Sequence, residues 1–202
     1  MKYGRAVEKL RILAEACQRT TGLPLEEPFL REAYVFGELL DGADPVDRVE
    51  VALVLNLPRE EVPWHSQPFG TAWLVDSLRL NKGGFAYWWR SRHDPVWNHH
   101  IRGPVRFWSL DGPDDTVLRA LADRRLADLP RVTAGPAEVR DRTAAELDAA
   151  LARLRAVRGS YWEREWRREH RGNYRYPENE LWDAVDGYLD LLETGQALDR
   201  PK

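Results

Sequence analysis

Apolar residues recur along this chain at two different intervals, which separate predicted helices from predicted strands. In residues 4–20 they fall three or four positions apart, so this segment is predicted to be an amphipathic helix with Cys17 on its buried face. The same interval predicts further helices over residues 27–40, 71–80 and 114–128, from residue 136 onward, and over residues 177–193. The tail after Gly195 is expected to fray.

The two C-terminal helices each carry an apolar stripe that is expected to be buried. In the first helix the stripe consists of Leu147, Ala150, Leu151, Leu154 and Val157. In the second helix it consists of Leu181, Trp182, Val185, Tyr188, Leu189 and Leu192. Because Gly135 and Pro136 interrupt the chain just before these helices, we expect a body of residues 1–135 and a helical extension of residues 136–202 packed on it.

Three shorter segments are rich in apolar and aromatic residues and predict strands, over residues 49–55, 85–90 and 105–110. The first is almost continuously apolar, which is typical of a strand that is buried on both faces in the interior of a sheet. Strands that alternate with helices along a chain indicate the α/β class. We therefore predict an α/β fold with a mixed sheet and flanking helices, followed by the C-terminal helical extension.

Residues 34–55 resemble the signature of the nucleotidyltransferase-like (polymerase beta-like) superfamily. In that family an apolar helix end runs into Gly-Ser, a short polar turn follows, and a strand of the form Asp-apolar-Asp-apolar carries the metal ligands. Here Phe36 and Gly37 match the apolar-Gly step, and residues 49–55 match the strand. The resemblance implies a nucleotidyltransferase-like fold, with the active-site cleft beside this turn and strand.

Three residues differ from the signature at the positions that carry its Ser and its two metal-binding Asp residues. Glu38 stands in place of the family's Ser, Arg48 in place of the first Asp and Glu50 in place of the second. Residues two apart on a strand point to one face, about 6.6 Å apart, so Arg48 and Glu50 are expected to share a face. Arginine stays protonated, so it would repel Mg²⁺ and is free to pair with the one remaining carboxylate.

Phosphoryl transfer depends on positioning and on charge stabilisation by metal ions, so these replacements imply a degenerate transfer site. We therefore expect a pseudoenzyme, a binding or regulatory protein with no metal or cofactor. Its ligand-binding residues would include Gly37, Glu38, Arg48 and Glu50.

Two other functions remain open. An enzyme could combine Glu50 with Asp41, Asp44 or Asp47 to hold Mg²⁺ and transfer a nucleotide to a protein or small molecule. A pure interaction protein, such as one half of a toxin and antitoxin pair, would instead use exposed aromatic residues to contact a protein partner.

Tryptophan is over-represented, with nine residues, six of them between Trp64 and Trp108. Neighbours on a strand face opposite ways, so one of Trp88 and Trp89 is expected to point away from the core. An aromatic and basic surface for a small anionic or planar ligand would then form from Trp88, Trp89, Trp97, Arg90, Arg92 and Arg102. We include Trp88, Trp89 and Arg90 among the predicted ligand-binding residues. Core positions are expected for Trp73, Trp108 and Trp182.

The net charge of -3 supplies no general attraction to nucleic acid, which is therefore not an expected partner. Residues 161–171 do interleave Tyr, Trp and Arg, but Glu163, Glu165 and Glu169 cancel much of that positive field. No apolar run approaches the roughly 20 residues of a membrane span, and the start of the chain lacks a secretory segment. We expect a soluble, cytoplasmic protein without a membrane partner.

Cysteine and histidine do not predict a metal site. The single cysteine, Cys17, excludes an internal disulfide and a cysteine-rich zinc site. His93, His99 and His100 lie in one segment with Asp94, but their spacing matches no helical pair of metal-binding histidines. We expect these side chains to form hydrogen bonds or to stack on Trp residues.

Overall fold

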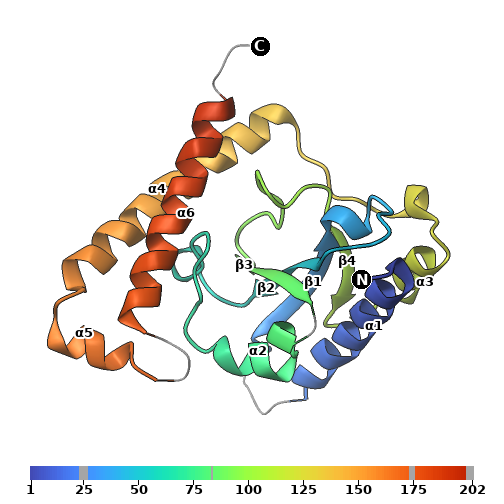
Figure 1. The fold of residues 1–202 in the computed structure, drawn as a ribbon, viewed down its shortest axis with the longest axis horizontal. Coiled ribbons are helices and arrows are strands. Elements are labelled where there is room, and N and C mark those ends of the chain that lie inside the picture. The colour runs from blue at the N-terminus through green and yellow to red at the C-terminus, as the bar shows by residue number, and fades with distance from the viewer. Residues whose placement is uncertain (23–26, 83, 173–175, 199–202) are drawn as a thin grey trace.

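The computed structural model describes residues 1–22, 27–82, 84–172 and 176–198, and a five-stranded sheet lies at its centre (Figure 1). The strands are β1 (Leu30–Phe36), β2 (Val49–Leu55), β3 (Phe85–Ser91), β4 (Val105–Ser109) and β5 (Gly112–Pro113). Their order is β3-β2-β1-β4-β5. β2 and β3 run parallel and the other neighbours antiparallel, so the sheet is mixed. The α/β class and the three predicted strands are therefore confirmed.

Six α-helices flank the sheet in the described part of the chain. They are α1 (Tyr3–Thr20), α2 (Ala72–Ser77), α3 (Asp115–Ala122), α4 (Pro136–Ser160), α5 (Arg164–Glu169) and α6 (Pro177–Leu198). Short 3-10 turns lie at Gly37–Leu39, Arg59–Glu61, Leu80–Lys82 and Leu126–Asp128. α4 and α6 form an antiparallel pair at one end of the molecule, and α1 lies at the other (Figure 1). No helix among the described residues is long and apolar enough to cross a membrane.

The helix predicted over residues 27–40 is wrong, because residues 30–36 form β1 in the middle of the sheet. β1 pairs with β2 on one side and with β4 on the other. Four consecutive residues, Ala33, Tyr34, Val35 and Phe36, are buried. A short apolar run of this kind fits a strand buried on both faces as well as a helix, and here the pairing partners decide.

α1 covers one face of the sheet and contributes much of the core. Its buried residues include Leu10, Leu13 and Cys17, as the helical pattern predicts. The Cys17 side chain is fully enclosed, and burial raises the pKa of its thiol. The predicted helices at 71–80 and 114–128 are shorter than expected, since α2 ends at Ser77 and α3 at Ala122 before 3-10 turns follow. α3 begins where Asp114 caps the backbone N–H groups of Thr116 and Val117.

The predicted buried stripe of α6 is wrong for Trp182 and Leu189, whereas Tyr188 is partly buried against the core. The helix instead buries Pro177, Glu180, Ala184, Gly187 and Leu191, and it leaves Trp182 69 % and Leu189 45 % exposed. The physical reason is close approach, because a Cβ atom on Gly187 would lie 2.5 Å from the carbonyl oxygen of Trp64. The small residues Ala184 and Gly187 therefore face inward where α6 meets Trp64, and Trp182 and Leu189 face outward. α6 continues past Gly195 to Leu198, and the rest of the predicted fraying tail, residues 199–202, lies outside the described residues.

Candidate functional site

The expected proximity of Gly37 and Glu50 is present at the end of the β1–β2 pair. Phe36 pairs with Glu50 across the two strands, and Gly37 follows with φ of 71°, a backbone conformation that favours glycine. A Cβ atom on Gly37 would lie 1.7 Å from Oε2 of Glu50. Only glycine therefore fits beside this carboxylate. Gly37 follows a strand, however, and does not follow the helix that the sequence predicts.

The Glu50 carboxylate is bonded to the turn that Gly37 begins. The backbone N–H of Glu38 donates to Oε2 of Glu50 at 3.3 Å, and Oε2 of Glu38 in turn accepts from the backbone N–H of Asp47 at 2.9 Å. Burial raises the pKa of the Glu50 carboxyl, the bond from Glu38 N–H opposes this, and the charges of Glu38 and Asp41 add to the rise. The carboxylates of Glu50 and Glu38 therefore both accept hydrogen bonds from backbone N–H groups of the segment between β1 and β2.

Arg48 lies just before β2 and does not share the environment of Glu50. Its Nε atom is 3.9 Å from Oδ2 of Asp47, and both side chains are largely exposed. No ion pair joins Arg48 to Glu50, both of which the structure describes. The predicted pairing of Arg48 with Glu50 is therefore absent, and Arg48 lies beside Asp47 instead.

Three aromatic rings stand beside Glu50 on the same face of the sheet. The register of β2 and β3 pairs Ala52 with Trp88, which places the indole on the Glu50 side. The ring centroids of Trp88 and His100 are 4.6 Å apart, and that of Phe36 lies 5.2 Å from Trp88. Nε2 of His100 is 4.0 Å from Oε1 of Glu50. We call Phe36, Glu50, Trp88 and His100 the aromatic-carboxylate site.

Burial alters the protonation of His100 as well. It lowers the pKa of the imidazole below its usual value, and the neighbouring charge of His99 lowers it further, while Asp190 opposes the change. A neutral ring is the form that stacks on Trp88 without a desolvated charge. The site is therefore an aromatic wall with a single carboxylate at its edge.

Trp88 and Trp89 point to opposite sides of the sheet, as the alternation predicts. Trp89 is buried against the core, and its ring centroid lies 5.4 Å from that of Tyr87 on the same face. Trp88 is half-buried in the aromatic-carboxylate site. Trp108 is also buried as expected and Trp73 partly so, whereas Trp182 is exposed.

The expected aromatic and basic surface does not form, because Arg90 is buried and not exposed. It is only 2 % exposed, and its Nη2 atom lies 2.7 Å from Oε1 of Glu146 on α4. The other two arginines are also engaged, since Arg92 lies 3.7 Å from Glu27 and Arg102 donates to the carbonyl of His99. The buried carboxylate on α4 accounts for the inward position of Arg90, because an unpaired charge there would be costly.

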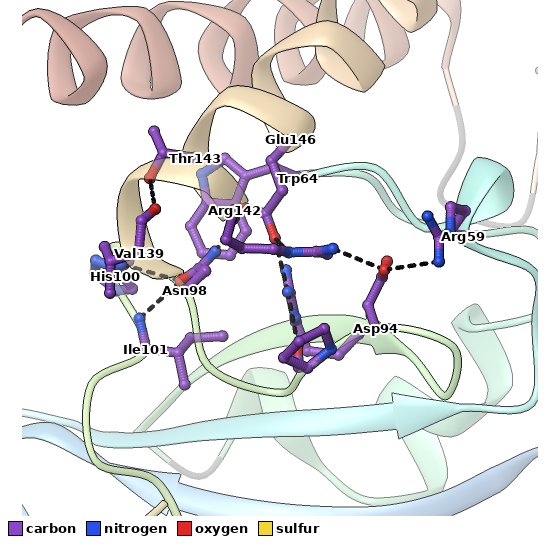
Figure 2. Close-up of polar contacts among 12 residues, drawn as sticks. Arg59, Trp64, Asp94, Asn98, His100, Ile101, Val139, Arg142, Thr143 and Glu146 are labelled. Carbon is purple, nitrogen blue, oxygen red and sulfur yellow. Dashed lines mark hydrogen bonds and ion pairs between the residues drawn. The ribbon is translucent and has the colours of Figure 1, made fainter. Parts of the chain in front are cut away.

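Glu146 is the centre of a buried polar network (Figure 2). Nε of Arg142 donates to Oε1 of Glu146 at 2.8 Å, and Nδ2 of Asn98 donates to Oε2 at 2.9 Å. A second Arg142 nitrogen, Nη1, donates to Asp94 at 2.7 Å. Burial alone would raise the pKa of the Glu146 carboxyl, but the charges of Arg90 and Arg142 outweigh it and lower the pKa. The network ties α4 to β3 and to the segment after it.

A second polar cluster joins α6 to the same side of the body. Nε1 of Trp64 donates to Oδ2 of Asp190 at 2.6 Å, and Nε2 of His99 lies 3.1 Å from the same oxygen. Nδ1 of His65 lies 2.6 Å from Oδ2 of Asp186, one helical turn away. His65 and His99 therefore anchor α6, and His99 forms a hydrogen bond, as expected from the sequence. The remaining one of the 93–100 segment, His93, is exposed and lies beside Arg92.

Asp190 should stabilise the fold at neutral pH and cease to do so in acid. The hydrogen bond with His99 lowers the pKa of its carboxyl from 3.8 to about 2; burial opposes this, and the Trp64 bond reinforces it. A pKa lowered by folding contributes stability that is complete above the unfolded value and is lost as pH falls from about 4 to about 2. Because the side chain is 38 % exposed, we discount the contribution for solvent screening to about 1 kcal/mol.

Urea unfolding of wild type and Asp190→Asn across this range tests the expectation. Asparagine can still accept from Trp64 but lacks the charge, so it should cost about 1 kcal/mol near pH 6 and almost nothing near pH 2. A cost that is the same at every pH would show that the charge of Asp190 is irrelevant.

Comparisons with known proteins place almost the whole chain in one family. A family model described as a domain of unknown function, DUF7711, matches residues 1–197. Neither the curated proteins nor the solved structures contain a match. Within the described residues, no group of three or more His, Cys, Asp or Glu side chains is placed to hold a metal ion.

Proposed function

The chain belongs to the DUF7711 family, a domain of unknown function, and we propose that it is a degenerate nucleotidyltransferase-like protein that binds a small planar ligand without transferring a nucleotide. The ligand would stack in the aromatic-carboxylate site. Trp88 and His100 offer partly exposed rings there, the buried Phe36 ring backs Trp88, and Glu50 offers an acceptor for a polar edge of the ligand. The cations once expected to favour an anion are engaged elsewhere, so a neutral or cationic ring suits the site better.

The observation that carries this proposal is the hydrogen bond from Glu38 N–H to Glu50. In the resembled family the strand carboxylates hold metal ions. Here the one carboxylate that remains binds its own turn, and its neighbours on the same face of β2 and β3 are Ala52 and Ala86. The side chain that stands for the first ligand, Arg48, is a cation. A nucleotide phosphate at this turn would therefore be repelled by the Glu50 carboxylate, because no metal ion would be held between them when residue 48 is a cation.

Fluorescence and calorimetric titrations with nucleosides and nucleoside triphosphates, each with and without Mg²⁺, test this function. We expect a nucleoside to quench tryptophan emission with no dependence on Mg²⁺, because stacking needs no metal. Trp88→Leu should remove the response, while Trp182→Leu, on the outside of α6, should keep it. Absence of any response to neutral or cationic planar compounds would count against the proposed site.

One observation favours the metal-dependent alternative, and the same titrations test it. The charges of Glu38 and Asp41 both raise the pKa of the Glu50 carboxyl, and a divalent cation beside Glu50 would relieve that repulsion, although Arg131 already lies 3.6 Å from Asp41. Asp44 is instead bonded to Arg124, and Asp47 lies beside Arg48. Micromolar binding of ATP that requires Mg²⁺ and is abolished by Glu50→Ala would establish the enzyme alternative and overturn our proposal.

A further inference from the structure

The outward face of α6 carries large apolar side chains that the chain leaves exposed. Trp182 and Leu189 are seven residues apart, which puts them on one face of the helix about 10 Å from each other. Glu178, Asp186 and Glu193 flank them, and residues 177–198 contain no lysine or arginine. Glu178 pairs with Arg167 and Asp186 with His65, so Glu193 is the ridge carboxylate that no described residue pairs with. We call these five residues the α6 ridge. It is an apolar and acidic surface.

The ridge extends toward α5 through another exposed aromatic ring. Trp162 is the most exposed large apolar side chain among the described residues. The guanidinium of Arg167 lies 5.7 Å from its ring centroid and donates to Glu178 at 3.0 Å. A contiguous exposed patch of aromatic residues with a polar rim is typical of a protein interface and is uncommon on a surface that faces only water.

A groove of opposite charge lies between α1, the end of α2 and the start of β3. Its volume is about 750 Å³. The lining residues that matter are the apolar Ile12 and Phe85 and the cationic Lys9, Arg19, Arg79 and Lys82. We call these six residues the basic groove. Its described lining includes no carboxylate, and Arg19, Arg79 and Lys82 have no carboxylate of a described residue within ion-pair distance.

The backbone at Arg79 adds a second reason to regard the groove as a built surface. Arg79 has φ of 54°, in the left-handed region, just after α2 ends. Glycine is the usual residue at such a helix end, and a residue with a side chain is strained there. Here the position carries a cation that lines the groove. Glycine would satisfy the backbone better but would remove that charge.

From this complementarity we propose that two copies of the chain associate by placing the α6 ridge of one in the basic groove of the other. Trp182 and Leu189 would pack against the apolar part of the groove lining, and Glu193 would meet the cations around it. α6 and α1 lie at opposite ends of the molecule, so a chain cannot fill its own groove (Figure 1). Two α6 ridges do not suit each other, because their carboxylates would repel. If each copy fills the other's groove, the pair closes as a twofold dimer.

Charge reversal gives a direct test of which surfaces meet. The groove variant is Arg79→Glu with Lys82→Glu, and the ridge variant is Glu193→Lys with Gln196→Lys, both at exposed residues without a described partner. Mass is measured by light scattering and sedimentation from about 1 to about 200 µM. We expect wild type to dimerise within this range and each variant alone to associate at least about tenfold more weakly.

Mixing the two variants separates this pairing from any other interface. In the mixture the acidic groove of one variant faces the basic ridge of the other, while the remaining groove and ridge are both wild type. The equimolar mixture should therefore regain association. Trp182→Ser should weaken wild-type association, and salt raised from about 0.05 to about 0.5 M should weaken it too.

Arg140→Glu with Arg155→Glu on α4 provides the matched control, since it reverses two exposed arginines outside both surfaces. It should dimerise like wild type. A wild-type protein that stays monomeric at about 200 µM would overturn the proposal. So would a dimer that neither variant weakens, or a mixture that fails to regain association. Circular dichroism confirms that each variant is folded before its mass is interpreted.

Discussion

Replacing Glu146 by alanine should lower the free energy of unfolding by about 3 to 5 kcal/mol, because Arg90 would remain buried without its partner. For a chain of this length that loss corresponds to a fall in Tm of about 6 to 20 °C. Thermal and urea unfolding measure it. Glu178→Ala is the matched control, since its carboxylate also pairs with an arginine but lies on the surface, and it should change stability little.

A double substitution distinguishes the loss of a partner from the loss of packing at the same place. Arg90→Met with Glu146→Leu replaces the buried pair by apolar side chains, which is often neutral for stability. It should therefore recover most of what Glu146→Ala loses. If the double variant were as unstable as Glu146→Ala, the damage would lie in packing or in the bonds that Arg142 and Asn98 lose with Glu146, and the uncompensated charge of Arg90 would not be its cause.

Gly37→Ala should destabilise the protein by about 2 to 4 kcal/mol. The new Cβ atom would lie 1.7 Å from Oε2 of Glu50, so the carboxylate must leave its hydrogen bond, and alanine is strained at φ of 71°. Gly159→Ala is the matched control. Gly159 lies in α4 with nothing within 4 Å of its added Cβ, so alanine should stabilise there by about 0.5 to 1 kcal/mol.

A double-mutant cycle isolates the contact between residues 37 and 50. With Glu50→Ala in place, the clash disappears and only the backbone cost of Gly37→Ala should remain. The coupling energy should therefore be at least about 1 kcal/mol. Additive effects, measured by urea unfolding of the four proteins, would mean that Gly37 and Glu50 are independent.

Much of the sheet could be predicted from sequence because its strands are short apolar runs between turn residues. β1 was the exception. Leu30, Ala33 and Tyr34 lie three and four positions apart, which is also the helical interval, so local pattern alone does not distinguish the two structures. The place of β1 between β2 and β4 decides, and that pairing joins residues far apart in the chain.

The candidate site was predictable only where it is local. Gly37 directly follows β1 and Glu50 lies in β2, the strand that pairs with β1, so their proximity agrees with what the resemblance implies. His100 comes from a segment without any periodic pattern, and its place beside Trp88 could not be anticipated. The prediction that Trp182 is buried fails because α6 has apolar residues on two sides, and the sequence does not show which side faces the body. The close approach of Gly187 to Trp64 turns the side with Gly187 inward and leaves Trp182 exposed.

The Glu146 network had one signal in the sequence that a closer interpretation could have used. Glu146 lies three residues after Thr143 and four before Ala150, and all three are buried on one face of α4. A carboxylate on the buried face of a helix requires a buried partner. The identity of that partner, Arg90, is set by the packing of α4 against β3, which sequence spacing does not encode.

Because Cys17 is enclosed, the rate at which its thiol is labelled reports how often α1 detaches from the sheet. A thiol that is fully buried and has a raised pKa cannot meet a disulfide reagent as a thiolate while α1 stays on the sheet. Labelling must therefore wait until the helix detaches, and under gentle conditions its rate follows the population of that open form. Because no second cysteine competes, one mass shift per molecule would count these openings in the native protein without denaturant.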